Sequence, residues 1–164
     1  MYREQKAGPF RVRLTVGGNL INFPGDISTK QIADILTAKM LINSIISTPG
    51  ARAAAIDLKD FYLENMLPNK EYIRIPLLYV PAEIIKQYNL TEFIEDGFVY
   101  AEISKGMYGL PQAGIVAENF LLPRLAEAGY HPTGKTPGLF KHVSNSITFS
   151  LVVDDFLIKY QGYN

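Results

Sequence analysis

Residues 150–160 read Ser-Leu-Val-Val-Asp-Asp-Phe-Leu-Ile-Lys-Tyr, so two adjacent carboxylates lie between two apolar runs. Short apolar runs rich in β-branched residues are typical of strands, which predicts a β-hairpin with Asp154 and Asp155 at its tip. Two like charges side by side at the end of buried strands repel each other. A divalent cation between them would relieve that repulsion, because such ions prefer carboxylate oxygens as ligands.

A third carboxylate lies near the end of another apolar run. Residues 51–58 read Ala-Arg-Ala-Ala-Ala-Ile-Asp-Leu, which predicts a short buried strand that carries Asp57. Three carboxylates on two neighbouring strands would form a site for two Mg²⁺ ions, the arrangement used in in-line phosphoryl transfer. Taken singly, each motif has a plainer interpretation: Asp57 as a residue that caps a turn, and the Asp pair as a solvated hairpin turn.

The composition restricts the class of protein. With 164 residues, of which 48% are hydrophobic, the chain is one domain or a piece of one and can bury a core. Sixteen basic and sixteen acidic side chains balance, which argues against a strong electrostatic grip on nucleic acid. The absence of cysteine excludes disulfides and Cys-based zinc sites. Because the N-terminus is charged and no apolar run approaches about 18 residues, we expect an intracellular protein without a membrane partner.

The order of predicted elements indicates the fold class. Ser28 and Gln31 resemble a capping box before a helical apolar period at 32–45, which Thr-Pro-Gly at 48–50 would end. Strands and helices in this order predict an α+β fold, with helices packed on one face of a mainly antiparallel sheet. The predicted strands are 10–20, 51–58, 72–75, 98–103, 138–143, 146–153 and 156–160. The other predicted helices are 81–88 and 112–129, the second kinked at Pro123.

A turn rich in glycine and proline at 105–114 leads into the predicted helix at 112. Free backbone N–H groups at that helix start, with Gln112 as a side-chain donor, could face a nucleotide. The alternative is a plain loop between a strand and a helix.

Three blocks of sequence resemble the polymerase motifs of reverse transcriptases, and most of all those of copia-type LTR retrotransposons. They are Ile-Asp-Leu-Lys-Asp-Phe-Tyr-Leu at 56–63, Met-Tyr-Gly-Leu-Pro-Gln-Ala at 107–113 and Val-Val-Asp-Asp-Phe-Leu-Ile at 152–158. The likeness runs from about residue 11 to the C-terminus. It implies a polymerase fold as a single domain fragment, with fingers at about 1–50 and 63–100, and palm at about 51–62 and 101–164. It also implies truncation before the thumb.

The resemblance implies a role for each carboxylate. Asp57, Asp154 and Asp155 would be the catalytic residues and would hold two Mg²⁺ ions, or Mn²⁺ in their place. Asp57 and Asp154 would be the direct ligands of both ions, with Asp155 in support. One ion would lower the pKa of a primer 3′-hydroxyl, and the other would hold the triphosphate and stabilise the leaving pyrophosphate. The reaction would be template-directed addition of dNTPs to a primer.

The resemblance also implies residues that bind the nucleotide. Tyr62 would place its ring under the sugar and exclude a ribose 2′-hydroxyl, which favours DNA synthesis. Gln112 would contact the incoming nucleotide or the template. Arg13 resembles the fingers arginine that grips the triphosphate, although Arg11 lies on the same predicted face and both fit a solvated strand.

Partners and location follow from the same resemblance. The partners would be an RNA or DNA template with its primer, dNTPs, and the remaining polyprotein with its thumb, RNase H and integrase. The location would be a cytoplasmic particle or the nucleus. Val152 departs from the family, which usually has Tyr there. Two alternatives remain open: an inactive relic of a retroelement, and a module that binds nucleic acid without chemistry.

Overall fold

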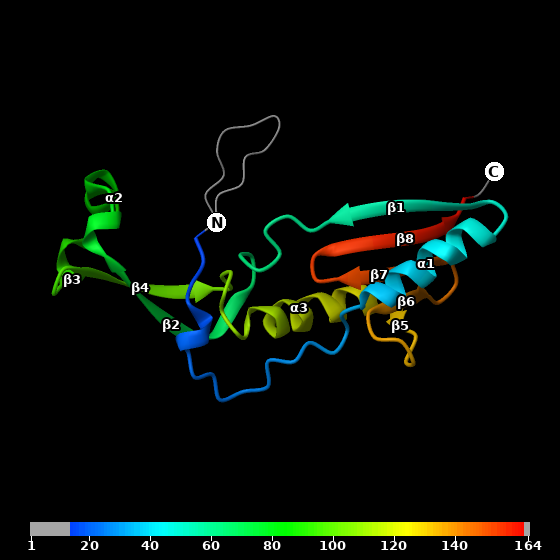
Figure 1. Ribbon diagram of the computed structural model, residues 1–164, viewed down its shortest axis with the longest axis horizontal. Helices are drawn as coiled ribbons and strands as arrows, with labels where there is room; N and C mark the ends of the chain where they lie inside the picture. The colour runs from blue at the N-terminus through cyan, green and yellow to red at the C-terminus, as the bar shows by residue number, and fades with distance from the viewer. Residues whose placement is uncertain (1–13, 163–164) are drawn as a thin grey trace.

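The computed structural model describes residues 14–162, and these form an α+β fold with two antiparallel sheets and a few helices (Figure 1). A five-stranded sheet has the order β1-β8-β7-β6-β5, and a three-stranded sheet has the order β2-β4-β3. The sheets lie at opposite ends of an elongated molecule, with α3 between them.

The strands are β1 (Ala51–Asp57), β2 (Met66–Pro76), β3 (Ile94–Glu95), β4 (Phe98–Lys105), β5 (Tyr130–Pro132), β6 (Leu139–His142), β7 (Ile147–Val152) and β8 (Asp155–Gln161). The helices are α1 (Ile35–Ser47), α2 (Ala82–Gln87), α3 (Ala113–Glu127) and the 3₁₀ turns η1 (Gly18–Leu20), η2 (Leu77–Tyr79) and η3 (Leu90–Phe93).

The predicted hairpin near residue 154 is confirmed as β7 and β8. Ser150 pairs with Leu157, and β8 pairs on its other side with β1. The prediction that β1 is buried is wrong, since most of its side chains are exposed. The reason is its position: β1 is the edge strand of the five-stranded sheet, and only β8 flanks it.

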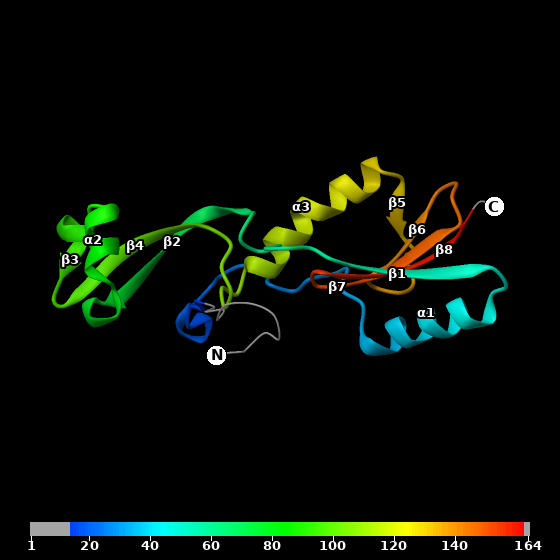
Figure 2. The same ribbon diagram turned by 90° about the horizontal axis from the view of Figure 1, so that it is seen from above.

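The two long helices cover opposite faces of the five-stranded sheet, as Figure 2 shows, so the prediction of helices on one face is wrong. Apolar side chains of α3 pack on a cluster that includes Phe140, Phe149 and Phe156. On the other face, the Lys159 ammonium group donates hydrogen bonds to Ser44 of α1 and to Thr48. Successive strand side chains point to opposite faces. On β8 the side toward α3 carries Phe156 and Ile158, whereas the side toward α1 carries Lys159, so the two helices cover faces of different character.

The three-stranded sheet extends away from the body (Figure 1). Its β2 strand is longer than the predicted 72–75, and it ends at Pro76 as expected, because proline cannot continue the ladder. Ile73 and Ile103 pack from this sheet against a second core around Val16 and Leu110. This core joins the sheet to the start of α3.

Two predictions near the N-terminus fail in the described part. Residues 14–20 contain a 3₁₀ turn and no strand, although 10–20 was predicted as one. The capping box at 28–31 is also wrong, because α1 starts at Ile35 with Asp34 as its cap. The Asp34 carboxylate accepts a hydrogen bond of 2.6 Å from the backbone N–H of Thr37. The expected helix end near residue 48 is confirmed.

The helix predicted at 112–129 is confirmed as α3, which runs through Pro123. Arg124 supports the turn around this proline, since its guanidinium donates to the Phe120 carbonyl at 2.8 Å and lies over the Phe120 ring. Among the residues described, no helix is long and apolar enough to cross a membrane.

Candidate active site

Asp57 and Asp155 lie directly opposite each other where β1 and β8 meet. Asp57 is the last residue of β1 and Asp155 is the first of β8, and their Cα atoms are paired in the register. Residues paired this way point to the same face with Cβ atoms about 4.5–5.5 Å apart. Both side chains are exposed. The fold therefore brings together two carboxylates that are about a hundred positions apart in the chain.

Asp154 lies beside this pair in the turn between β7 and β8. Its carbonyl accepts a hydrogen bond of 2.8 Å from the N–H of Leu58, which follows Asp57. Val153 has φ of 61° in the same turn. A β-branched residue is rarely found in this left-handed region, and such strain gathers at functional turns. The backbone thus ties all three predicted carboxylates to one end of the sheet.

Tyr62 lies near Asp154. Burial raises the pKa of the Tyr62 hydroxyl above its ordinary value, and the negative charge of Asp154 and the neighbouring Tyr108 raise it further. The ring packs edge-on against Tyr108 with centroids 5.7 Å apart, and against Phe61 at 5.6 Å. The aromatic ring predicted under the sugar is therefore held in place near Asp154.

Gln112 is buried, with 2% of its surface exposed. Its Nε2 donates a hydrogen bond of 2.7 Å to Oε1 of Glu71 on β2. Its own Oε1 is buried without a hydrogen-bond partner among the described residues. The backbone N–H of Ala113, the first residue of α3, donates to the Leu110 carbonyl. The donors expected to face a nucleotide at this helix start are thus partly engaged within the protein.

Arg13 lies outside the described residues. Three positions later, the N–H of Val16 donates to the carbonyl of Tyr108 at 2.9 Å. A Cβ added to Gly109, which has φ of 93°, would lie 2.1 Å from the Val16 carbonyl oxygen. This close packing anchors the segment after Arg13 to the turn that carries Tyr108.

The carboxylates fit a magnesium site in part. Oxygen ligands suit Mg²⁺, and the Asp57–Asp155 pair supplies them on one face of the sheet. No group of three or more His, Cys, Asp or Glu side chains in residues 14–162 is arranged to hold a metal ion. Asp154 occupies the turn instead of a position in the ladder, and its backbone carbonyl accepts the hydrogen bond from Leu58.

Sequence reasoning missed the polar side chains that support this region. Glu71 is the partner of Gln112. Glu118 is buried in α3, and its carboxylate accepts hydrogen bonds from the backbone N–H groups of Lys30 and Gln31. The available signal in the sequence was Glu118 itself, a glutamate next to small apolar residues in a predicted helix. A glutamate on the buried side of a helix needs hydrogen-bond partners, because burial of an unpaired charge is costly.

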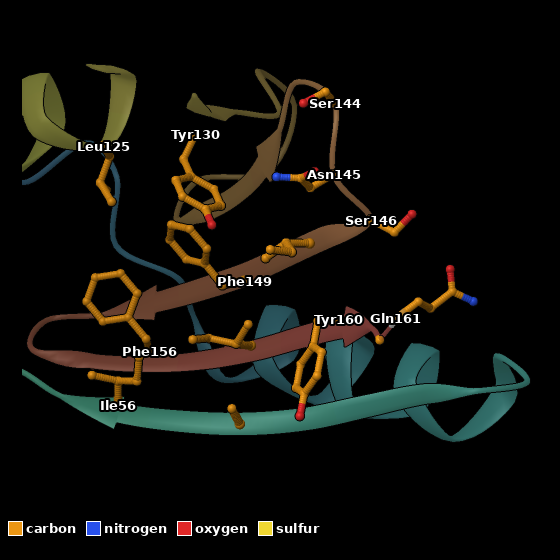
Figure 3. Close-up of a pocket in the computed structure, with 14 residues that line it drawn as sticks. Ile56, Leu125, Tyr130, Ser144, Asn145, Ser146, Phe149, Phe156, Tyr160 and Gln161 are labelled. Carbon is orange, nitrogen blue, oxygen red and sulfur yellow. The ribbon is translucent and has the colours of Figure 1, made fainter. Parts of the chain in front are cut away.

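A cavity of about 730 Å³ lies on the same sheet (Figure 3). Its walls are largely apolar and include Ile56, Phe149, Phe156 and Leu125, with Asn145 among the polar residues at one end. Ile56 and Phe156 precede and follow Asp57 and Asp155 in the chain, and side chains alternate along a strand. The cavity therefore opens on the face opposite to the carboxylate pair and is a separate feature.

The chain has no significant match among known protein families, curated protein sequences or solved structures. Its function must therefore be argued from its own residues and their geometry.

Proposed function

We propose that this chain is the fingers and palm part of an RNA-directed DNA polymerase of the copia-like retrotransposon type. The observation that carries the proposal is the pairing of Asp57 with Asp155, with Asp154 in the adjoining turn. Three sequence blocks that resemble polymerase motifs contribute the residues around this point. Like charges directly opposite each other destabilise a sheet, and a bound cation would offset that cost.

In this proposal the carboxylates bind divalent cations, Mg²⁺ or Mn²⁺. The ions, when bound, would activate a primer 3′-hydroxyl and stabilise the departing pyrophosphate. Asp57 and Asp155 share one face of the sheet, and Asp154 would complete the ligand set. The strained turn at Val153 sets the position of Asp154 relative to that pair.

Tyr62 would select the sugar. Its ring is fixed by Tyr108 and Phe61 and lies close enough to Asp154 for the carboxylate charge to raise the pKa of its hydroxyl. A rigid ring next to the metal ligands would exclude a substrate that carries a 2′-hydroxyl. Gln112 would reach a nucleotide only after its Nε2 leaves Glu71, so its first role here is to join α3 to β2.

Primer extension tests the proposal. The chain is incubated with a primed RNA template, dNTPs and Mg²⁺ or Mn²⁺, and extension is compared with that of Asp154→Asn. Asp96→Asn, at an exposed turn before β4, is the matched control and should extend as the unmodified chain does. Tyr62→Ala should retain extension and accept ribonucleotides more readily, because the ring that excludes the 2′-hydroxyl is gone.

One observation favours a second candidate, an inactive relic that keeps the fold: Val152 stands where the family that the three blocks resemble usually has Tyr. A relic would show no rise in melting temperature on addition of Mg²⁺, whereas a functional site binds the ion and is stabilised by it. Absence of both extension and a Mg²⁺-dependent shift would reject the polymerase proposal.

A further inference from the structure

The strand β1 leaves one edge of the five-stranded sheet open. It is flanked by β8 alone, and no strand within residues 14–162 pairs with its other side. Most of its side chains are exposed, and Figure 1 shows the strand along the border of the sheet. An open edge seven residues long presents a row of unpaired backbone groups, which are a template for another strand.

The other sheet edges of the described chain are protected against such pairing. β5, at the far side of the same sheet, has three residues and ends in Pro132. β2 contains Pro68 and Pro76, and its register is irregular between Met66 and Glu71. β3 has two residues. Proline, irregular pairing and shortness all discourage the pairing of edge strands, and β1 has none of these features. The fold therefore leaves β1 as the edge available to a partner strand.

The direction of the backbone groups of β1 follows from a hydrogen bond at its end. The N–H of Leu58 donates to the carbonyl of Asp154, so the backbone of Leu58 is directed toward the β8 side. Backbone groups alternate in direction along an antiparallel ladder. Every second residue back from Leu58 therefore bonds to β8, and the residues between them, Ala53, Ala55 and Asp57, direct their N–H and C=O groups to the open edge.

We propose that β1 pairs with β1 of a second copy of this chain, in the antiparallel direction and about a two-fold axis at Ala54. In this register Ala53 lies opposite Ala55 of the second copy, and Ala51 lies opposite Asp57. The free backbone groups of each strand then meet those of the other along the whole strand. A shift by one residue would oppose them to groups that already bond to β8. The two five-stranded sheets become one continuous sheet.

The side chains of β1 favour a second copy over a strand of another protein. When a strand is added to a sheet edge, the backbone provides affinity, and pockets for alternate side chains provide specificity. Four of the seven residues of β1 are alanine, whose side chains are too short to form such pockets along the edge. A second copy needs no pocket, because it brings the same small side chains in a register that fits its own backbone groups.

The pairing buries no charge. Side chains of a strand point to the two faces of the sheet, so strands that join edge to edge leave both faces as open as before. Arg52 lies opposite Ile56 of the second copy, and its aliphatic stem covers that side chain, which is 51% exposed in the single chain. Asp57 lies opposite Ala51 and stays exposed, so its carboxylate remains free to bind a cation.

The contact is closed. A two-fold axis uses the same edge of both copies, and the other edge of the sheet ends in Pro132, so the dimer is the largest species expected. The contact uses the backbone of β1 and no carboxylate group. It therefore stands independently of the polymerase proposal, and a failure of either leaves the other intact.

Sedimentation velocity over a range of protein concentrations tests the pairing. The unmodified chain should form dimers and nothing larger. Ala55→Pro removes an outward N–H that the single chain does not use, so this variant should stay folded and its dissociation constant should rise at least tenfold. Ala55→Ser is the matched control, because it changes the same side chain and keeps the N–H, and it should dimerise as the unmodified chain does. Circular dichroism and thermal melting confirm that both variants are folded.

An exchange of charge at the two-fold axis tests the register. Ala54 lies opposite itself, so Ala54→Lys and Ala54→Glu each place two like charges face to face, and each variant alone should dimerise at least tenfold more weakly. An equimolar mixture of the two should form the heterodimer, because opposite charges then face each other.

Four results would overturn the proposal. They are an unmodified chain that is monomeric at every concentration, species larger than a dimer, equal dimerisation of Ala55→Pro and Ala55→Ser, and a mixture of the two Ala54 variants that associates no better than each variant alone.

Discussion

Asp57 and Asp155 face each other across β1 and β8 at the end of the five-stranded sheet, with like charges at directly paired positions. Both are exposed, so water screens their repulsion, yet like charges at directly opposite positions still destabilise a sheet. A bound cation or a positively charged substrate group would offset this repulsion. The relationship therefore leads to a stability measurement that needs no assay of activity.

Asp155→Asn should stabilise the metal-free protein by up to about 1 kcal/mol, because it removes one of two opposed charges. Urea unfolding in the presence of EDTA measures this change. With Mg²⁺ the unmodified chain should become the more stable of the two proteins, since it gains binding energy that the variant lacks. Asp96→Asn should behave as the unmodified chain in both conditions, and a loss of stability in metal-free Asp155→Asn would contradict the repulsion argument.

The raised pKa of Tyr62 predicts a loss of stability at high pH. Burial and the Asp154 charge disfavour the tyrosinate, so the folded protein holds this proton above pH 10, where the unfolded chain releases it. The stabilisation is complete below pH 10 and is lost as the pH rises through the folded pKa. In urea unfolding across this pH range, the free energy of unfolding should decline less for Tyr62→Phe than for the unmodified chain.

The Asp154 charge has its own signature in the same titration. Asp154→Asn should lower the pKa of Tyr62 toward its ordinary value, although burial will keep it above that value. The difference in tyrosinate absorbance between each protein and its Tyr62→Phe counterpart isolates this one ring. An unchanged titration in Asp154→Asn would show that the carboxylate does not act on the ring.

Gly138→Ala should unfold the protein or cost far more than about 2 kcal/mol. Gly138 has φ of 69°, and an added Cβ would lie 2.0 Å from the backbone nitrogen of Ala33. Gly134→Ala is the matched control, since Gly134 has φ of 79° with open space around it. Its cost should be the left-handed strain alone, about 1–2 kcal/mol. Equal melting temperatures for the two variants would show that the chain near Ala33 does not pack against Gly138.

Removing the partner of Gln112 should destabilise the junction between α3 and β2. Glu71→Ala leaves the buried Nε2 of Gln112 without an acceptor, which should cost about 1–3 kcal/mol in urea unfolding. Glu71→Gln keeps an acceptor oxygen at that position and should cost much less. If both variants unfold alike, the amide of Gln112 has another partner in solution.

The hairpin, the positions of its carboxylates and most strand and helix positions could be predicted from the sequence. Local patterns carry that information: β7 and β8 are short apolar runs around two aspartates, and α3 follows a turn rich in glycine and proline. The start of α1 was misplaced because two capping signals compete. Asp34 caps the helix, while Glu118, from 84 positions later, holds the backbone at residues 30–31.

The sequence by itself determined which residues are candidates for chemistry, because residue type and spacing are local properties. Only the tertiary structure decided which of them meet. The pairing of Asp57 with Asp155 depends on the register between β1 and β8, and the burial of Gln112 depends on Glu71 in the other sheet. The two faces of the five-stranded sheet take different helices: α3 packs on the aromatic cluster, and Lys159 donates hydrogen bonds to Ser44 of α1 on the other face. Contacts between segments far apart in the chain are set by packing, which no local pattern encodes.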